Sequence, residues 1–345
     1  MALFRKKAPL SRTEVLETPQ YGWIWKPLVA LVVIYLLVCI VLGIWWSWTP
    51  KPTDPGQAVE LQRGFPQTVD TGNGEASSQP AVQPGEALLA SNIAILDTLL
   101  DKPGGYLRND VMPPGLWLDN MPSWETGVTR QVRDAVAALN ASLSVGSAPL
   151  GQADDSLSGD LDSWRWPASE TVLRATRNNL GEAFNALENS SGPGAPDQDS
   201  AASAEPPAPD ASALSDWLAQ VQERLQTQTQ HLAANVGQSP NGDQQSDSTP
   251  WLRIDNVFFE ARGTTWALAQ LMQAARIDYA EVIESSGVDA DFDQLIAELQ
   301  SSQARVWSPV ILNGSGFGLF ANHSLMMANY TVRASQLVEK IRNQL

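Results

Sequence analysis

Residues 28–48 read LVALVVIYLLVCIVLGIWWSW and contain no charged side chain. An α-helix rises about 1.5 Å per residue, so this stretch spans roughly 32 Å and is long enough to cross a hydrocarbon core of about 30 Å. We therefore predict a transmembrane helix over residues 27–49 that holds the chain in a lipid bilayer through Leu28–Trp48. This helix decides which compartment the remaining residues occupy.

The flanks of this apolar run predict its orientation. Residues 1–26 carry five basic and two acidic side chains, whereas residues 50–69 carry only two basic ones. Lys and Arg concentrate on the cytoplasmic side of membrane helices, and tryptophans mark both interfaces. We expect a cytoplasmic tail over residues 1–26 and a C-terminal region on the far side. The tryptophans at the two ends are Trp23, Trp25, Trp45, Trp46 and Trp48.

A cleaved signal peptide is the alternative explanation of the run. Its apolar region would be about 7–15 residues long and would end at a small-x-small site, which the longer run does not do. No cysteine follows Cys39, so the region beyond the run has no disulfides. Eukaryotic extracellular domains of this size usually carry them. We therefore expect a single-pass bacterial inner-membrane protein with a periplasmic C-terminal domain.

The charge balance excludes several classes of ligand. The chain carries 22 basic and 38 acidic residues, for a net charge of −16, and the acidic excess lies beyond the first 50 residues. An acidic surface repels phosphate backbones, so we expect no nucleic-acid partner. The only histidines are His231 and His323, far apart and without thiols beyond Cys39. We therefore expect no metal site and no cofactor.

Composition divides the rest of the chain. Residues 50–85 are rich in Pro, Gly, Ser and Gln and predict a flexible stalk, followed by a periplasmic domain over residues 86–345. Polar stretches at 146–160, 189–210 and 237–249 predict loops or disordered insertions. The stretch at 189–210 leaves open whether the domain is one unit or two.

Apolar residues between these stretches recur with a helical period. Leu89, Ile93, Leu96 and Leu100 are typical, and similar stripes follow within residues 128–143, 173–187, 212–236, 254–275, 292–299 and 326–341. Strand alternation is nearly absent. We predict an all-α bundle of about seven amphipathic helices. Ser212 and Asp289 are candidate N-caps.

One irregular segment, residues 102–124, combines Gly104-Gly105 and Pro113-Pro114 with aromatic rings. Such a long irregular loop is often functional, although it is also consistent with a simple cap over helix ends. Its candidate surface for a ligand or partner consists of Tyr106, Arg108, Asn109, Asp110, Trp117 and Asp119.

A second irregular segment covers residues 306–324 and contains Asn313-Gly-Ser-Gly-Phe-Gly318. It satisfies neither the dinucleotide-binding pattern nor the nucleophile elbow around Ser315. A glycine-rich turn before a helix starting near Asn322 offers amides to an anion, but a tight chain reversal explains it more simply. His323 is a further candidate, and a structural hydrogen bond at the helix start is its simpler role.

Glu260 lies among rings in VFFEARGTTW. A carboxyl group in such surroundings can act as the acid of a glycan-cleaving enzyme. An internal ion pair with Arg262 or Arg253 is the simpler interpretation. A cleft lined by Tyr106, Trp117 and Glu260, with a second carboxylate about 5–9 Å away, would favour the glycan hypothesis.

Several long strings resemble a known family: GGYLRND at 104–110, PPGLWLDNMPSWE at 113–125, STPWLRIDNVFFEARGTTWAL at 248–268 and VWSPVILNGSGFGLFANHSLMMANY at 306–330. Over roughly residues 86–345 the chain resembles the bacterial membrane-protein family labelled "domain of unknown function 2333". The resemblance implies a Gram-negative bacterial protein with one membrane helix, and it implies no activity.

The sequence favours a non-enzymatic scaffold that presents a periplasmic helical bundle to an envelope protein partner. The alternative is a periplasmic domain that binds or processes a glycan such as peptidoglycan, or senses a ligand. We assign no catalytic residue, and the oligomeric state stays open.

Overall fold

The computed structural model describes residues 21–64, 82–165, 167–191, 210–235, 249–250, 253–306, 311–312 and 322–345. These ranges hold eleven α-helices and no strand, which confirms the all-α class. The helices are α2 (Tyr21–Trp46), α3 (Pro55–Gln62), α4 (Glu86–Asp101), α5 (Asn120–Ser142), α6 (Ser147–Ser158), α7 (Ser169–Ser191), α8 (Ala211–Asn235), α9 (Ile254–Asp278), α10 (Ala280–Ser285), α11 (Asp289–Ser301) and α12 (His323–Arg342).

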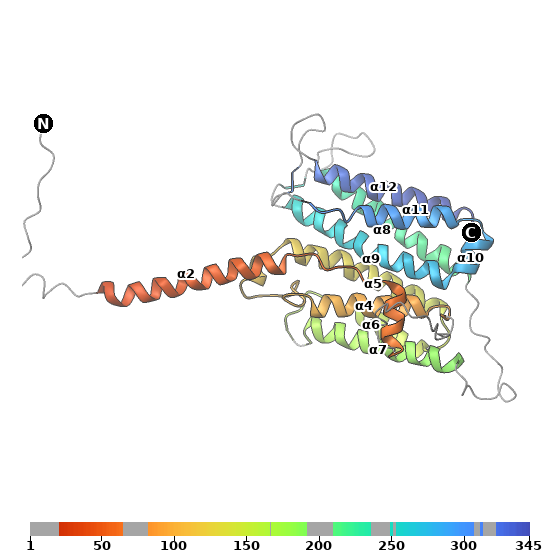
Figure 1. The fold of residues 1–345 in the computed structure, drawn as a ribbon, viewed down its shortest axis with the longest axis horizontal. Coiled ribbons are helices and arrows are strands. Elements are labelled where there is room, and N and C mark those ends of the chain that lie inside the picture. Colours follow the sequence, from red (N-terminus) through yellow and green to blue (C-terminus); the bar gives the residue numbers. More distant parts are fainter. Residues whose placement is uncertain are drawn as a thin grey trace, which may run out of the picture.

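The predicted apolar helix is α2, which projects from one end of the bundle (Figure 1). Its stretch Trp25–Trp46 is the one described helix that is long and apolar enough to cross a membrane. Most of its large apolar side chains are exposed, as expected of a helix whose surroundings are not protein.

The seven predicted amphipathic helices correspond to α4, α5, α7, α8, α9, α11 and α12. Helices α5 and α9 pack together in the centre of the bundle, with α4, α6 and α7 on one side and α8, α11 and α12 on the other (Figure 1). One continuous cluster of buried apolar residues extends from α3 to α12.

The backbones of α5 and α9 almost touch where each helix has a glycine. A Cβ atom placed on Gly263 would lie 2.0 Å from the carbonyl oxygen of Trp124, and one on Gly127 would lie 2.1 Å from that of Glu260. The close approach brings Trp124 and Trp266 together edge to face, with ring centroids 4.9 Å apart and both rings buried. Aromatic pairs favour this geometry.

The prediction of a flexible stalk over residues 50–85 is wrong for its first part, which contains a helix. Residues 55–62 form α3, which buries Ala58 and Val59 against the core. The Asp54 side chain caps this helix by accepting from the Gln57 amide at 3.2 Å, and Arg63 lies 2.5 Å from Glu86 in a buried ion pair. Residues 65–81 lie outside the described residues.

The loop predicted over residues 146–160 is wrong, because residues 147–158 form α6. Its three buried side chains, Leu150, Ala153 and Leu157, pack against α5 and α7. Three apolar residues suffice for a helix held on two neighbours, although its composition is polar. Neither predicted N-cap is at the cap position. Asp289 is the first residue of α11 and follows the N-cap Val288, and Ser212 lies inside α8, which begins at Ala211.

Helix α4 is capped from across the fold. Asp278, at the end of α9, is fully buried and accepts from the amides of Ala87 at 3.1 Å and Leu88 at 2.8 Å. Burial raises the pKa of the Asp278 carboxyl to about 7, opposed by these amides. The Asp278 carboxyl that caps α4 therefore changes its charge within the physiological pH range.

Replacing Gly263 by alanine should force α5 and α9 apart. The added methyl group meets the Trp124 backbone, and overpacking of this kind costs about 1–3 kcal/mol or more. Urea unfolding of the purified full-length protein, followed by circular dichroism, measures the loss. The matched control is Gly181→Ala in α7, where a Cβ meets nothing within 4 Å. That change should raise stability by about 0.5–1 kcal/mol. Equal effects of the two substitutions would contradict the close contact.

Asp278 should make stability depend on pH. Its folded pKa of about 7 lies above the unfolded value of about 3.9, so its favourable contribution is complete below about pH 4 and is lost as pH rises to about 7. The stability of the natural protein relative to Asp278→Asn should therefore fall over this window, by at most about 4 kcal/mol, and then stay constant. Urea unfolding of both proteins across the window tests this, and a pH-independent difference would refute it.

Candidate functional site

A buried ion pair fixes the loop between α4 and α5. Lys102 Nζ lies 2.6 Å from Glu125 Oε1, and both side chains are at most 1% exposed. Glu125 also accepts from the amides of Leu107 at 2.9 Å and Arg108 at 2.8 Å. Burial raises the pKa of the Glu125 carboxyl, whereas Lys102 and these amides act to lower it. One carboxyl group thus clamps the first turns of the loop onto α5.

Three of the predicted loop residues make contacts inside the fold. The buried Tyr106 hydroxyl donates to the Leu161 carbonyl oxygen at 3.0 Å. Arg108 pairs with Asp162, with Nη2 and Oδ2 3.0 Å apart. Asn109 donates to Glu170 at 2.9 Å and to the Ser163 carbonyl at 3.1 Å. These four contacts hold the loop against the segment that precedes α7 and against the first turn of α7, which agrees with the simpler structural role.

The other three loop residues do not gather into a site. Asp110 is half-buried, and burial together with the nearby Glu170 carboxylate raises its pKa. Asp119 is exposed directly before α5. Trp117 ends a 3₁₀ turn over Gly115–Trp117, and its ring is 55% exposed.

Glu260 lies in an ion pair, but not with the predicted partners. Its carboxylate pairs with Arg130 of α5 and accepts from Gln228 Nε2 of α8 at 2.9 Å. Arg262 instead donates to the carbonyl oxygens of Gln303 at 2.8 Å and Ala304 at 3.0 Å. Pairing within α9 is therefore corrected to pairing across three helices. Tyr106 is buried, so it does not line an open cleft with Trp117 and Glu260.

His323 begins α12, as predicted for a helix starting near Asn322. Its Nδ1 accepts from the Leu312 amide at 3.0 Å, and its own amide donates to the Leu312 carbonyl at 2.8 Å. Partial burial lowers the pKa of the imidazole. This is the structural hydrogen bond expected of it. Asn313 and Ser315 lie outside the described residues.

A hollow lies where α2 joins the bundle. This junction cavity has a volume of about 750 Å³. One wall is the connecting segment 48–52, and the others come from the start of α5, from α9 and from the chain after α11. Its lining residues are Trp48, Thr49, Pro50, Lys51, Pro52, Asn120, Asp255, Phe259, Arg262, Trp266, Gln303, Arg305, Val306 and Ile311.

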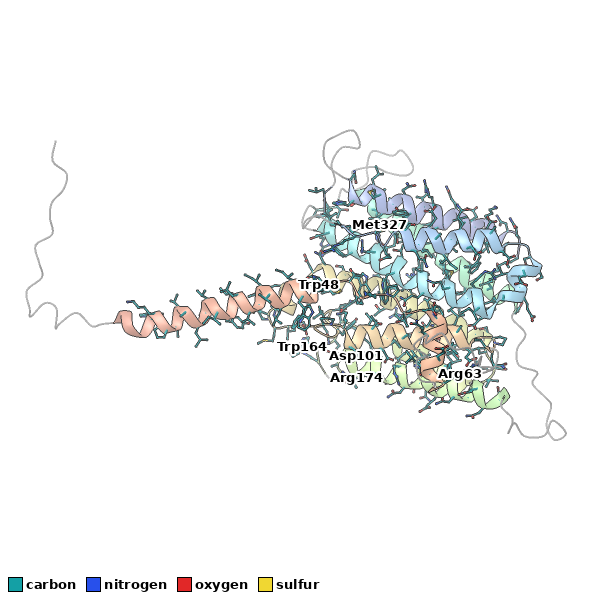
Figure 2. All side chains as sticks on the ribbon, in the orientation of Figure 1. Trp48, Arg63, Asp101, Trp164, Arg174 and Met327 are labelled. Carbon is teal, nitrogen blue, oxygen red and sulfur yellow. The ribbon has the colours of Figure 1, made fainter. Side chains whose placement is uncertain are left out.

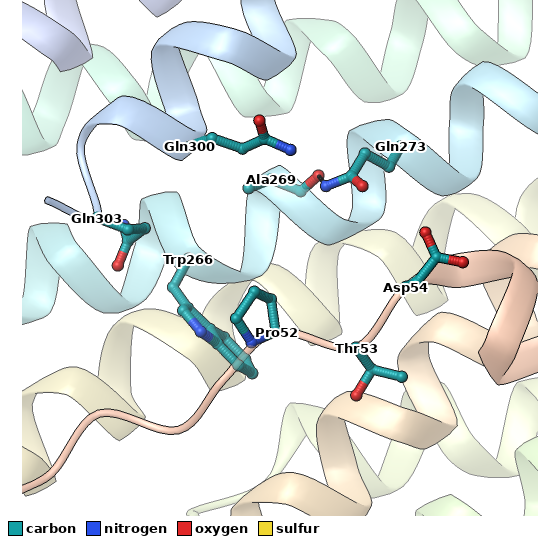
Figure 3. Close-up of a pocket in the computed structure, with 8 residues that line it drawn as sticks. All are labelled: Pro52, Thr53, Asp54, Trp266, Ala269, Gln273, Gln300 and Gln303. Atoms are coloured by element: carbon teal, nitrogen blue, oxygen red, sulfur yellow. Dashed lines mark hydrogen bonds between the residues drawn. The ribbon is translucent and has the colours of Figure 1, made fainter. Parts of the chain in front are cut away.

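The chain between α2 and α3 is hydrogen-bonded to α9 at two positions. Trp266 Nε1 donates to the Pro50 carbonyl oxygen at 3.1 Å, and the Thr53 amide donates to Gln270 Oε1 at 2.9 Å. Figure 3 shows Pro52 beside the Trp266 ring in a second, smaller hollow of about 260 Å³. This hollow shares Pro52, Trp266 and Gln303 with the junction cavity.

The end of α2 also contacts the loop that follows α4. Gly104 has a φ of +88°, and a Cβ there would lie 2.7 Å from the indole of Trp46. Leu118 reaches Gly43 in the last turns of α2, 3.6 Å from where a Cβ would stand. The junction therefore joins α2, the loop and α9 directly.

The junction cavity combines aromatic rings with two kinds of charge. Burial lowers the pKa of Arg262, and burial together with Asp119 raises the pKa of Asp255. This lining suits a small amphipathic group. Within the described residues, no cluster of three or more His, Cys, Asp or Glu side chains is placed to hold a metal ion. Sequence reasoning found only Arg262 of this site, because its outer wall lies in the predicted stalk.

The described residues form an all-helical fold with one apolar helix near the N-terminus, which contacts the bundle directly. The chain belongs to the family described as "Uncharacterized protein conserved in bacteria (DUF2333)", whose model matches residues 18–345. This confirms the resemblance and extends it toward the N-terminus. No curated protein and no solved structure matches the chain.

Substituting Glu125 by glutamine should release the loop. The change leaves the Lys102 ammonium buried without a counter-charge, and such a loss costs about 3–5 kcal/mol. Urea unfolding measures the stability, and hydrogen exchange should show faster exchange of the loop amides.

The control for this substitution is Asp97→Asn. Asp97 forms an ion pair with Arg177, in which Oδ1 and Nε are 2.9 Å apart. Its two side chains are 37% and 38% exposed, and exposed pairs contribute less than about 1 kcal/mol. An effect of Glu125→Gln no larger than that of the control would show that the clamp does not hold the loop.

Proposed function

We propose that the chain is a single-pass inner-membrane protein with a cytoplasmic N-terminal tail and a periplasmic bundle. The bundle serves as a non-enzymatic scaffold for another envelope protein. The length and apolarity of α2, the basic tail and the thiol-free bundle support this location.

The observation that carries the scaffold role is the hydrogen-bonded connection between α2 and the bundle. Trp46 lies against Gly104. The Pro50 carbonyl accepts a hydrogen bond from Trp266, and the Thr53 amide donates one to Gln270. A flexible tether would let the bundle search a wide volume. A bonded connection instead holds the bundle at one height and one orientation, which suits a partner that is itself fixed in the envelope.

The contacts of the candidate surface residues Glu260 and Arg262 support the same choice. Glu260 is held by Arg130 and Gln228, and Arg262 by two carbonyl groups. A general acid in a glycan-cleaving site needs an accessible proton beside a second carboxylate. The described geometry favours the scaffold over the glycan hypothesis.

Two reporter fusions test the location. Alkaline phosphatase fused after Leu345 should be active in cells, because it folds only outside the cytosol. A reporter that works only in the cytosol should be silent at the same position. The opposite pattern would refute the proposed topology.

Crosslinking in intact cells tests the scaffold role. A photoreactive residue on the exposed side of α12, for example at Lys340, should capture one envelope protein reproducibly. An insertion of several Gly-Ser repeats after Pro50 should weaken that capture, because it frees the bundle from α2. Capture of only random envelope neighbours by the natural protein would contradict the proposal.

A further inference from the structure

A compact group of large apolar side chains is exposed at the end of the bundle where α2 enters. Five residues, here called the apolar patch, have exposed fractions of 48% to 71%: Val111, Met112, Leu116, Trp117 and Trp164. Four belong to the loop between α4 and α5. Trp164 comes from the segment before α7 and lines a small hollow with Val111 and Met112. Exposed apolar side chains that gather in this way are typical of a contact surface.

The patch lies level with the last turns of α2. Leu118, the residue after Trp117, reaches Gly43 inside the apolar helix, and Trp46 lies against Gly104 at the other end of the loop. At about 1.5 Å per residue, Gly43 stands roughly 5 Å along the axis before Trp46. A bilayer that covers α2 therefore ends at the depth where the loop begins. Figure 2 shows Trp48 and Trp164 at the end of the bundle that faces α2.

The chemistry of the patch matches a membrane interface. Tryptophan is enriched at the headgroup level, where its ring meets both apolar and polar surroundings. The Arg165 guanidinium lies 5.2 Å from the centroid of the Trp164 ring, so a cation accompanies this ring at the surface. Trp45 and Trp48 of the α2 end are also exposed, at 49% and 67%. The exposed tryptophans of the loop and of the segment before α7 thus add to the exposed tryptophans at the end of α2.

The loop is held in a form that keeps these side chains outward. The Lys102–Glu125 pair clamps its beginning, and Asn109 ties its middle to Glu170. Asp110 lies against Gly115, where a Cβ would meet its carboxylate at 1.8 Å. The side chains that point inward, such as Tyr106 and Leu107, are buried. The apolar tips are thus part of an ordered structure.

We propose that Val111, Met112, Leu116, Trp117 and Trp164 insert into the interface of the bilayer that holds α2. The loop gives the bundle a second contact with the membrane. The inference rests on the proposed membrane anchoring of α2. It commits to lipid because the loop that carries four of the five patch residues contacts the end of that helix through Gly104 and Leu118.

Single-cysteine probes test this in the full-length protein. Cys39 is the only cysteine, so Cys39→Ala gives a cysteine-free background. Met112→Cys and Trp117→Cys variants are labelled with an environment-sensitive fluorophore in nanodiscs of phosphatidylethanolamine and phosphatidylglycerol. Two matched positions complete the set. Leu36→Cys probes the middle of α2, and Glu284→Cys probes α10 at the opposite end of the bundle (Figure 1).

The loop probes should emit at shorter wavelength than the Glu284 probe. They should be quenched most by lipids that carry the quencher near the headgroup, whereas the Leu36 probe is quenched most by lipids with the quencher deep in the acyl chain. Adding Leu116→Asp should shift the Met112 and Trp117 emission toward the aqueous value. Circular dichroism of each variant checks that the bundle stays folded.

Two results would overturn the inference while leaving the anchor intact. The loop probes would either report water, as at Glu284, or be shielded without any quenching by lipid, which would indicate a second copy or another protein on the patch. A Leu36 probe that deep quenchers do not reach would instead refute the anchoring of α2. The two failures are therefore distinguishable.

Discussion

The direct contact between the backbones of α5 and α9 at Gly127 and Gly263 constrains the rest of the structure. Because the two helices touch there, neither can slide or rotate against the other without a steric clash. Helix α5 carries Glu125, which clamps the loop, and α9 carries Trp266, which holds the connecting segment. The register of this one helix pair therefore fixes both the loop and the connection to α2.

The sequence predicted those helices that show a helical pattern of apolar residues within their own segment. The seven long helices each show a sustained apolar stripe, which is a local property of the chain. Helices α3 and α6 lack that signal, because each buries only a few small or aliphatic side chains in a polar context. Their helical form depends on neighbours, such as α4 and α9 for α3, that are distant in sequence. Composition alone therefore suggested flexible chain at both places.

The candidate site was harder to predict than the fold because its contacts join distant residues. Glu260 was expected to pair with an arginine of its own helix, but its partner is Arg130. The Pro50 carbonyl, in the predicted stalk, is bonded to Trp266. Nothing in the local sequence of either residue identifies its partner. The sequence did indicate a ring-rich irregular loop over residues 102–124, which follows from local turn chemistry. The prediction holds only as far as Asp119, because residues 120–124 form the first turn of α5.

A single membrane helix leaves a protein free to tilt and to rotate about the helix axis, and packing or interfacial anchors must set both angles. The bonded connection removes the independent motion of the bundle relative to α2, but it leaves the tilt and rotation of the whole molecule unset. A second lipid contact, displaced sideways from the helix axis, would restrict that tilt, because tilting away would pull apolar side chains into water. The faces of α8, α11 and α12, which lie across the bundle from α7, would then hold a fixed height above the membrane (Figure 1). For the proposed scaffold, such a fixed height is itself a usable property, since it selects partners whose own binding surface stands at the same distance from the bilayer.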